Sequence, residues 1–326
     1  MANILIIGSG AFGTALSQPL IDNNNNVYFY SKNQEVSKQI MNGNHPLFPN
    51  IKIKPPKKCF NNYDEAFNNN IDIVLLCAPS KSLISIYEDI KKYLNENIII
   101  INTAKGLNPS SKKGVWSELF GIDETKKYAL IVGPSFAEDV LNKHKTIINV
   151  VSSSFDVAKY VMSIFNNNYF KLVYFDDENV ASLCSSLKNA LAIGLGLVSF
   201  LDNSMNTHSA FLTIGLSEIQ KLISTLTGNN KNQILDFFGV GDIFLTCSSD
   251  MSRNYRFGYQ LGQFGLKQTI EQLNKQTVEG YRTIEYINKC IETHKINLPL
   301  FSSLYEICYK EKDPKIFLDL VWNKIN

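Results

Sequence analysis

A short apolar run followed by a glycine-rich loop begins the sequence and constrains the fold more than any other feature. Residues 4–7 (ILII) are typical of a buried strand, and the loop GSGAFG follows directly at residues 8–13. A helical pattern begins near Thr14. Strand, glycine loop and helix in this order are typical of the first βαβ unit of a dinucleotide-binding domain.

The three glycines of this loop have separate expected roles. Gly8 would permit the tight turn, Gly10 would let backbone N–H groups approach a pyrophosphate, and Gly13 would let the helix pack on the strand. The phosphates would then lie at a helix N-terminus, where unpaired N–H groups and the helix dipole favour anions. The alternative is a structural turn that happens to be rich in glycine, but the flanking strand and helix favour the dinucleotide site.

Two residues complicate this interpretation. Pro19 falls inside the expected helix and should kink or shorten it. At the end of the second predicted strand, where NAD enzymes usually carry Asp or Glu, the chain has Ser31 and Lys32. A neutral and a basic group would tolerate or attract a 2′-phosphate, so NADPH is expected to be accepted alongside NADH. The alternative is that Lys32 is an exposed lysine without a role.

The hydrophobic pattern predicts two domains. Up to about residue 175, β-rich runs alternate with helical patterns, which indicates a mostly parallel sheet. The expected strands are 4–7, 27–30, 71–77, 98–102, 129–132, 147–152 and 170–175. Beyond Asp176 only helical periodicity remains. We therefore predict an α/β fold with a doubly wound Rossmann-type domain at 1–176, which binds the dinucleotide, and an all-α substrate-binding and catalytic domain at 177–326.

Composition excludes several classes of function. A net charge of +2, spread along the chain, gives no sign of a nucleic-acid surface or a polybasic membrane patch. The six cysteines form no CxxC pair and are expected to be reduced thiols. The four histidines lack metal-ligand spacing, so no metal site is predicted. The first residues show neither the basic region nor the cleavage site expected of a secretory signal, and the apolar run at 190–201 is too short to cross a bilayer. A cytoplasmic protein without membrane insertion is expected.

Polar residues follow three of the predicted strands, at residues 77–80 (CAPS), 102–107 (NTAKGL) and 132–138 (VGPSFAE). Ligands of a doubly wound sheet bind beyond the carboxyl ends of its strands, so these loops would line one crevice. By its position Lys105 would be a cation directed into that crevice; the alternative is an ordinary surface charge. Ser135 is a good helix cap, and capping alone would explain it.

Lys188 is the main candidate for acid–base chemistry. It interrupts an otherwise apolar or small helical stretch, and desolvation would lower its pKa from about 10.4 toward neutrality. The alternative is that its amine reaches the surface. Asp242 could pair with this lysine and orient it. Arg253 and Asn254, expected in a loop, offer a donor fork and an amide suited to a phosphate, although such residues are often only surface groups.

Eight ordered blocks carry a resemblance to a known family. They are GSGAFGTAL (8–16), CAPS (77–80), TAKGL (103–107), GPSFAEDV (133–140), LKNALAIGLG (187–196), GVGDIFLTCSS (239–249), SRNYRFG (252–258) and VEGYRT (278–283). Through them the sequence resembles NAD(P)-dependent sn-glycerol-3-phosphate dehydrogenases of the bacterial type over essentially its whole length. The resemblance implies reversible hydride transfer between NAD(P)H and dihydroxyacetone phosphate, which supplies sn-glycerol 3-phosphate for glycerophospholipid synthesis. It also implies a helical domain like the C-terminal domain of 6-phosphogluconate dehydrogenase, and a homodimer.

The resemblance also assigns residues, with Lys188 as the catalytic acid and base. The implied substrate-binding residues are Lys105, Gly133, Ser135, Asn189, Asp242, Thr246, Ser252, Arg253 and Asn254. The implied cofactor-binding residues are Gly8, Gly10, Ala11, Phe12, Gly13, Lys32, Lys105, Ala137, Arg253, Val278 and Glu279. Three positions depart from the family pattern, because Ser is common at Ala11, and Arg is usual at Lys32 and at Ile214. These departures put cofactor choice and affinity in doubt more than the reaction.

Two other functions remain open at this stage. Another β-hydroxyacid or 6-phosphogluconate-type dehydrogenase would share the cofactor domain and a catalytic lysine, but it should lack the SRN block at 252–254. A non-catalytic dinucleotide-sensing module would need no buried lysine at all.

Overall fold

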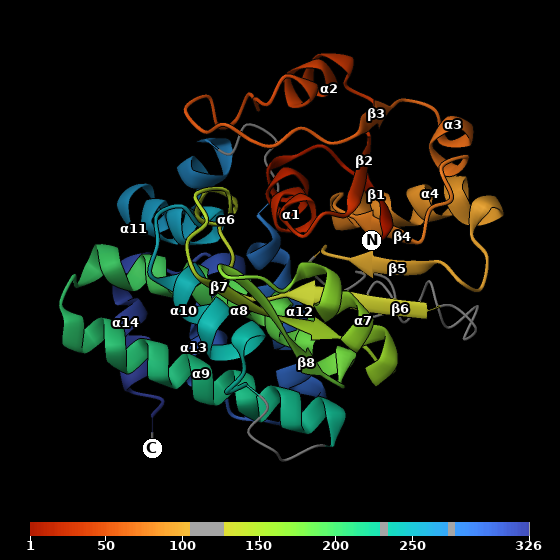
Figure 1. Cartoon of the computed structure of the whole chain (residues 1–326). Helices are drawn as coiled ribbons and strands as arrows, with labels where there is room; N and C mark the ends of the chain where they lie inside the picture. Colours follow the sequence, from red (N-terminus) through yellow and green to blue (C-terminus); the bar gives the residue numbers. More distant parts are fainter. Residues whose placement is uncertain (105–126, 229–233, 273–277, 326) are drawn as a thin grey trace. The chain divides into compact units, whose positions relative to one another are not determined.

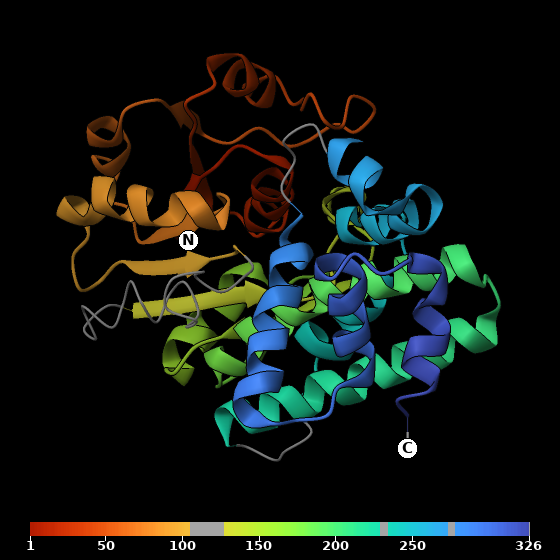
Figure 2. The same cartoon turned by 180° about the vertical axis from the view of Figure 1, so that it is seen from behind.

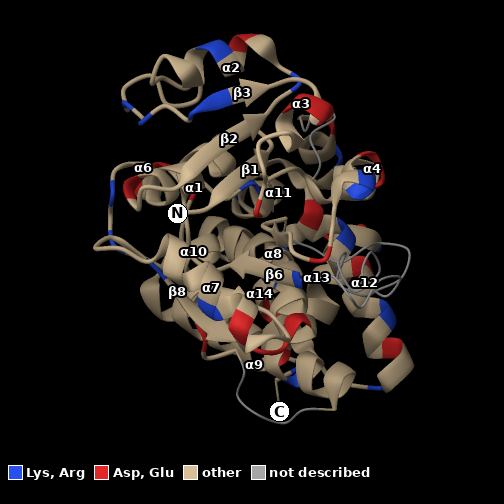
Figure 3. Ribbon diagram, turned by 45° about the vertical axis from the view of Figure 1, so that its right-hand side comes forward, with Lys and Arg blue, Asp and Glu red and all other residues tan. Residues whose placement is uncertain are grey.

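The computed structural model describes residues 1–104, 127–228, 234–272 and 278–325. The chain divides into two compact units, Met1–Asn179 and Val180–Asn326. Figure 1 colours the first unit from red to green and the second from green to blue. The first unit is built on a β-sheet, whereas the described residues of the second form helices and no strand. Acidic and basic residues are interspersed in both units (Figure 3).

The apolar runs of the first unit form one eight-stranded sheet with the order β3-β2-β1-β4-β5-β6-β7-β8. Neighbouring strands are parallel, except that β6 and β7 pair antiparallel. The strands are β1 Asn3–Ile7, β2 Asn26–Tyr30, β3 Lys58–Phe60, β4 Ile73–Leu76, β5 Ile99–Asn102, β6 Lys127–Val132, β7 Thr146–Val151 and β8 Phe170–Phe175. The predicted α/β class with a doubly wound, mostly parallel sheet is confirmed.

The short strand β3 was not predicted. It pairs with the last three residues of β2 and lies at the edge of the sheet. Its three residues Lys58-Cys59-Phe60 go from exposed to buried, and they are too few to show the alternation of polar and apolar residues that indicates a strand. An edge strand of this length depends on its neighbour, so only the tertiary structure defines it.

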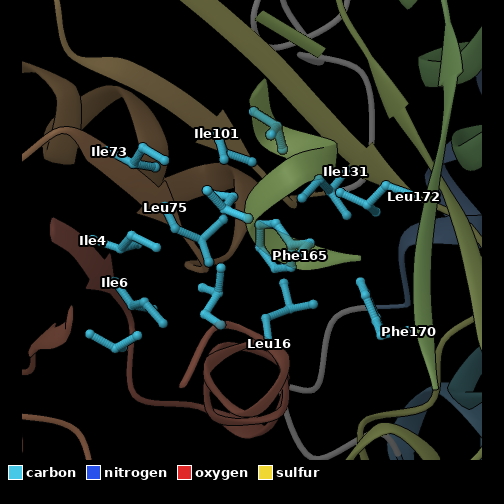
Figure 4. Packing of buried hydrophobic residues seen from close by; sticks show 14 of the residues in the cluster. Ile4, Ile6, Leu16, Ile73, Leu75, Ile101, Ile131, Phe165, Phe170 and Leu172 are labelled. Carbon is cyan, nitrogen blue, oxygen red and sulfur yellow. The ribbon is translucent and has the colours of Figure 1, made fainter. Parts of the chain in front are cut away.

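Helices cover both faces of the sheet because its central strands are apolar on both sides. Ile4 and Ile6 of β1 join one core cluster, whereas Leu5 and Ile7 join the opposite one. Figure 4 shows the first cluster, in which strand side chains pack against helices α1 and α7. The helices of this unit are α1 Ala11–Asp22, α2 Gln34–Met41, α3 Tyr63–Phe67, α4 Ser80–Ile90, η1 Lys91–Tyr93, α6 Ala137–Leu141 and α7 Phe155–Phe165.

Helix α1 continues through Pro19 and ends at Asp22, so the prediction that Pro19 shortens the helix is wrong. The proline lacks only its own N–H donor, and its carbonyl still accepts from Asn23 N at 3.1 Å. Residues from Gly13 to Leu20 are all buried. Packing of this length of helix outweighs the loss of one hydrogen bond.

The second unit is organised around the long helix α8. Its described helices are α8 Glu178–Leu201, which begins at the end of the first unit, α9 Met205–Thr227, η2 Phe237–Gly241, α10 Asp242–Cys247, α11 Arg253–Gln272, α12 Glu279–His294, α13 Pro299–Tyr309, η3 Pro314–Ile316 and α14 Phe317–Trp322. Figure 2 shows this helical unit from behind, with α12 and α13 in blue. By length and composition α8 could cross a membrane, but 94% of its apolar window is buried inside the protein, as in a core helix.

Glycines bring the neighbouring helices close to the backbone of α8. A Cβ on Gly258 of α11 would lie 1.9 Å from the Ile193 carbonyl oxygen, and one on Gly196 would lie 2.0 Å from the Tyr255 carbonyl oxygen. Neither position therefore accepts a side chain without movement of the backbone. This close contact holds the start of α11 beside α8, where the candidate catalytic lysine lies.

Candidate active site

The glycine loop follows β1 and turns directly into α1. Gly8 has φ +119°, in the region that favours glycine, and a Cβ there would lie 2.5 Å from the Cys77 carbonyl oxygen. A Cβ on Gly13 would lie 2.3 Å from the Gly8 carbonyl oxygen. Gly10 differs, because a Cβ there would meet no protein atom within 4 Å. Gly8 and Gly13 thus serve the fold, whereas Gly10 faces open space.

The first turn of α1 suits an anion. Its N-cap, Gly10, provides no side-chain hydrogen bond, and the first turn, which holds Ala11 and Phe12, carries no acidic residue. The N–H groups of the first turn and the positive end of the helix dipole therefore remain available to a ligand. The open space at Gly10 is a cradle that a side chain would fill, so these residues fit the pyrophosphate of a dinucleotide.

Ser31 and Lys32 follow β2, but only one of them is exposed. The Ser31 hydroxyl is buried and lies 2.6 Å from the Ser9 hydroxyl. It also contacts the backbone of Asn33, which caps α2. Ser31 therefore joins the glycine loop to the end of β2, and exposed Lys32 is the cation at this position.

The loops after β5 and β6 carry three further predicted substrate residues. Gly133 has φ +151°, and a Cβ there would lie 2.7 Å from Cβ of Ile148, so only glycine fits. Ser135 donates to the Gly133 carbonyl oxygen at 3.1 Å. It does not cap α6, whose N-cap is Phe136 and whose first residue is Ala137, so the capping prediction is wrong. Lys105 lies outside the described residues.

The helical unit contains a buried ion pair. Lys188 Nζ on α8 lies 2.6 Å from Asp242 Oδ2, and the two side chains are 3% and 2% exposed. The same amine donates to Thr246 Oγ1 at 2.9 Å, and Thr246 donates to the Asp242 carbonyl oxygen at 2.6 Å. The alternative in which the lysine reaches the surface is therefore wrong, and the expected pairing with Asp242 is present.

Local backbone geometry places Asp242 opposite the lysine. The π-helical turn η2 ends directly before it, and Gly239 in this turn has a non-helical backbone. A Cβ on Gly239 would lie 2.0 Å from the Ile234 carbonyl oxygen, so the turn requires glycine there. Asp242 is then the first residue of α10, and Thr246 lies one turn further along the same helix.

Two buried cysteines lie near the ion pair and were not predicted as part of the site. Burial is the main cause that raises the pKa of Cys184 and of Cys247; Asp242 raises both and Lys188 lowers both, with Asp242 the larger influence at Cys184 and Lys188 the larger at Cys247. Both thiols therefore stay protonated near neutral pH and are poor nucleophiles. Cys184 and Lys188 are at positions i and i+4 of a predicted helix, so their side chains are expected on the same face. This spacing is the sequence signal that could have placed Cys184 near the lysine.

A second polar group joins the starts of α11 and α12 to α8. Asn254 Nδ2 donates to Asn189 Oδ1 at 3.0 Å, and Asn254 Oδ1 accepts from Gly280 N at 3.0 Å. Asn189 Nδ2 in turn donates to Glu279 Oε2 at 3.4 Å. Asn189 is the next residue after Lys188, so this network adjoins the ion pair along α8.

Arg253 and Asn254 are the first two residues of α11, so the prediction that they lie in a loop is wrong. The backbone N–H of Tyr255 donates to the Ser252 hydroxyl at 3.3 Å, so Ser252 caps this helix. Val278 is the N-cap residue of α12 by position and makes no side-chain capping hydrogen bond. The helix end gives Arg253 a setting that a loop would not, because first-turn N–H groups and the helix dipole both favour a phosphate.

The predicted residues thus form groups within each unit. The sheet unit holds the glycine loop, Lys32, and the turn with Gly133, Ser135 and Ala137. The helical unit brings together the ion pair with Thr246 and the polar group at the starts of α11 and α12. Ile214, where the family pattern has Arg, lies half-buried on α9 and joins neither group in the described contacts.

Comparisons with known proteins cover nearly the whole chain. Residues 3–158 match the N-terminus, and residues 177–319 the C-terminus, of NAD-dependent glycerol-3-phosphate dehydrogenase. A glycerol-3-phosphate dehydrogenase [NAD(P)+] of Malacoplasma penetrans is 35% identical, in an alignment that covers 99% of this chain and 98% of the relative. The enzyme of that name from Francisella tularensis subsp. novicida is 33% identical, over 96% of this chain and 95% of the relative.

Solved structures show the same fold. The crystal structure of glycerol-3-phosphate dehydrogenase from Coxiella burnetii superposes with a TM-score of 0.84 at 25% identity and covers 98% of both chains. A Mycobacterium tuberculosis 3-hydroxyisobutyrate dehydrogenase, of the class considered as an alternative, gives a TM-score of only 0.56 at 11% identity.

Proposed function

Because the chain belongs to the NAD-dependent glycerol-3-phosphate dehydrogenase family, we propose that it interconverts dihydroxyacetone phosphate and sn-glycerol 3-phosphate. It is an oxidoreductase, and its cofactor is NAD(P)H. The observation that carries the proposal is the ion pair of Lys188 and Asp242, which places an ammonium group in the interior of the helical unit with Thr246 as a second partner.

Lys188 is the proton donor and acceptor in this proposal. When bound, NAD(P)H would supply a hydride to the ketone carbon, and negative charge would develop on the ketone oxygen. The Lys188 ammonium stabilises that oxygen and gives it a proton, and the neutral amine removes the proton from the alcohol in the reverse direction. Asp242 and Thr246 hold the amine in one direction, which lowers the cost of orienting it in the transition state.

The phosphate of the substrate binds at the start of α11 in this proposal. Arg253 supplies a planar pair of N–H donors, and the first turn of the helix adds backbone donors of its own. Asn254 has one side-chain hydrogen in the contact with Asn189 and a second that can serve the phosphate. Lys105, Gly133, Ser135 and Ser252 complete the proposed substrate set.

The dinucleotide binds at the glycine loop, with its pyrophosphate over the first turn of α1. Exposed Lys32 lies where a ribose 2′-phosphate is expected, which supports the use of NADPH. Ala137, Val278 and Glu279 are the further proposed contacts, each at or next to a helix N-terminus. The sheet unit is thus the dinucleotide-binding domain, and the helical unit is the substrate and catalytic domain.

The direct test adds dihydroxyacetone phosphate to the purified protein with NADH and, separately, with NADPH, and follows cofactor oxidation. We expect cofactor oxidation with the phosphorylated ketone. In the reverse direction, with NAD(P)+, we expect cofactor reduction with sn-glycerol 3-phosphate and none with non-phosphorylated hydroxy acids. Lys188→Met should abolish turnover while NADH still binds, and Lys171→Met, at an exposed position of β8, is the matched control. Turnover that survives Lys188→Met would exclude the proposed acid.

The proposal also includes the location, the oligomeric state and the metabolic role of the enzyme. We expect a cytoplasmic homodimer that acts on a soluble small molecule and supplies glycerol 3-phosphate to glycerophospholipid synthesis. Light scattering on the purified protein measures the mass in solution, and a monomer at working concentration would contradict the dimer without affecting the proposed reaction.

A further inference from the structure

A buried histidine outside the proposed set of site residues contacts the glycine loop. His45 is 2% exposed and lies between α2 and β3. Its Nε2 lies 3.0 Å from the Ser9 carbonyl oxygen, across 36 residues of sequence. Its Nδ1 accepts from the backbone N–H of Leu47 at 3.2 Å. Both ring nitrogens are therefore engaged, one with the loop and one with its own segment.

These two contacts fix the tautomer of the imidazole. A peptide carbonyl only accepts, so Nε2 must carry the proton that bonds to Ser9, and a peptide N–H only donates, so Nδ1 must present its lone pair to Leu47. His45 therefore acts as a neutral donor to the glycine loop.

The segment that carries His45 is fixed independently of the loop. The side chain of Gln18 on α1 accepts from Lys54 N at 2.8 Å and donates to the Lys54 carbonyl oxygen at 3.2 Å. The Phe48 ring lies next to the imidazole, with 5.6 Å between the ring centroids. The donor is thus held in place by groups that do not belong to the glycine loop.

The contact with Ser9 determines the direction of the next N–H group. The structure has no cis peptide bond in its described residues, so the Ser9 carbonyl and the Gly10 N–H point in opposite directions across one planar peptide. Because His45 draws the carbonyl toward the interior, the Gly10 N–H points away from it. The hydroxyl contact between Ser9 and Ser31, at 2.6 Å, holds the same residue from its side chain.

We propose that His45 is a positioning residue for the dinucleotide, because its Nε2–H holds the Ser9–Gly10 peptide with the N–H of Gly10 presented to the pyrophosphate. Without this donor the peptide could turn its carbonyl lone pairs toward the phosphates, which would repel them. The inference rests on the proposed function only in that the glycine loop is taken as the site of the pyrophosphate.

Two substitutions separate the contact with Ser9 from the contact with Leu47. His45→Gln keeps a side-chain N–H at the reach of Nε2. His45→Asn can place its amide oxygen near the position of Nδ1, but its N–H donors sit on a shorter side chain that does not reach the Ser9 carbonyl oxygen. Fluorescence titration of the full-length variants with NADPH, without substrate, should give a dissociation constant raised roughly five- to tenfold in His45→Asn, as expected for one lost hydrogen bond. In His45→Gln the constant should stay within about twofold of the wild type.

Two further measurements separate positioning from general stability. The turnover number at saturating cofactor and the KM for dihydroxyacetone phosphate should be unchanged in His45→Asn, while the KM for the dinucleotide rises. The ¹⁵N spectrum of the imidazole in the ligand-free wild-type protein should show the neutral form protonated at Nε2. A protonated or Nδ1–H ring, or equal loss of affinity in both variants with equal loss of melting temperature, would overturn the proposal.

Gly10→Ala distinguishes failure of this inference from failure of the proposed cofactor site. If Gly10→Ala weakens NADPH binding while His45→Asn does not, the loop binds the dinucleotide and only the role of His45 is wrong. If neither variant changes binding, the pyrophosphate does not lie at this loop, and both proposals fall.

Discussion

Lys188 Nζ and Asp242 Oδ2 lie 2.6 Å apart with almost no access to solvent. An ion pair in such a position contributes little net stability, because desolvation of the two charges offsets their attraction. Loss of either partner is nevertheless costly, because it leaves the other charge buried and unpaired. The pair therefore has consequences for activity and for stability that can be measured separately.

We expect Asp242→Asn to lower both turnover and stability. The free energy of unfolding should fall by about 3 kcal/mol, as is usual when one partner of a buried pair is removed. The double variant Lys188→Met/Asp242→Leu should regain most of this stability but no activity, since no charge then remains unpaired. Urea unfolding and cofactor oxidation measure the two effects. Full turnover in Asp242→Asn would show that the carboxylate does not orient the amine.

Gly10→Ala should weaken dinucleotide binding without loss of stability, whereas Gly13→Ala should lower the stability of the fold. A methyl group at Gly10 meets no protein atom within 4 Å, so this variant should fold as the wild type does and bind the dinucleotide at least tenfold more weakly, roughly the loss of one charged hydrogen bond. A methyl group at Gly13 would lie 2.3 Å from the Gly8 carbonyl oxygen, so that variant should lose stability. Melting temperature and NADPH titration distinguish them. Unchanged affinity in Gly10→Ala would argue against a pyrophosphate at this loop.

Lys32→Asp tests the expected use of NADPH. Lys32 is exposed directly after β2, so the substitution should not affect the fold. A carboxylate there would repel a 2′-phosphate but could accept a hydrogen bond from a ribose hydroxyl. The ratio of kcat/KM for NADPH to that for NADH should fall by about tenfold or more, equivalent to about 1.4 kcal/mol. Lys38→Asp on α2 is the control, and equal effects in both variants would assign the change to net charge alone.

Glu218 predicts a pH dependence of stability in the helical unit. Its two carboxylate oxygens accept from Leu300 N at 2.6 Å and Phe301 N at 3.0 Å, at the start of α13. Burial raises the pKa of Glu218 from 4.5 to about 7, although these two hydrogen bonds lower it. The folded state therefore holds its proton more tightly than the unfolded state between pH 4.5 and about 7. The stability from this group is complete below pH 4.5 and is lost as the pH rises toward 7.

Glu218→Gln removes this titration. The free energy of unfolding of the wild type should decline more between pH 5 and pH 8 than that of the variant, by up to roughly 3 kcal/mol. The variant should also be less stable at low pH, because its amide nitrogen faces a backbone N–H. Exposed Glu271→Gln on α11 should keep the wild-type slope. If Glu218→Gln also kept the wild-type dependence of stability on pH, the pKa of the Glu218 carboxyl would be the same in the folded and unfolded states.

The strands and helices with strong periodic patterns were predictable, and those without them were not. The apolar run at 4–7 and the long pattern of α8 specify their elements because burial of a periodic face is a local property of the sequence. Strand β3 and the start of α11 have no such pattern, and each depends on a neighbour: β2 for the strand, and α8, through Gly196 and Gly258, for the helix. Pro19 likewise lies inside a helix because the surrounding residues are buried.

The sequence by itself determined the class of fold, the glycine loop and the lysine to examine, because strand and helix periods, glycine spacing and a charge within an apolar stretch are all written in consecutive residues. Only the tertiary structure decided that Lys188 meets Asp242 and Thr246, that Ser135 bonds to Gly133 instead of capping α6, and that His45 holds Ser9. Most of these contacts join segments that are distant in the chain. Their hydrogen bonds require atoms to be placed to within a few tenths of an ångström, and tertiary packing sets this placement, whereas spacing along the sequence does not.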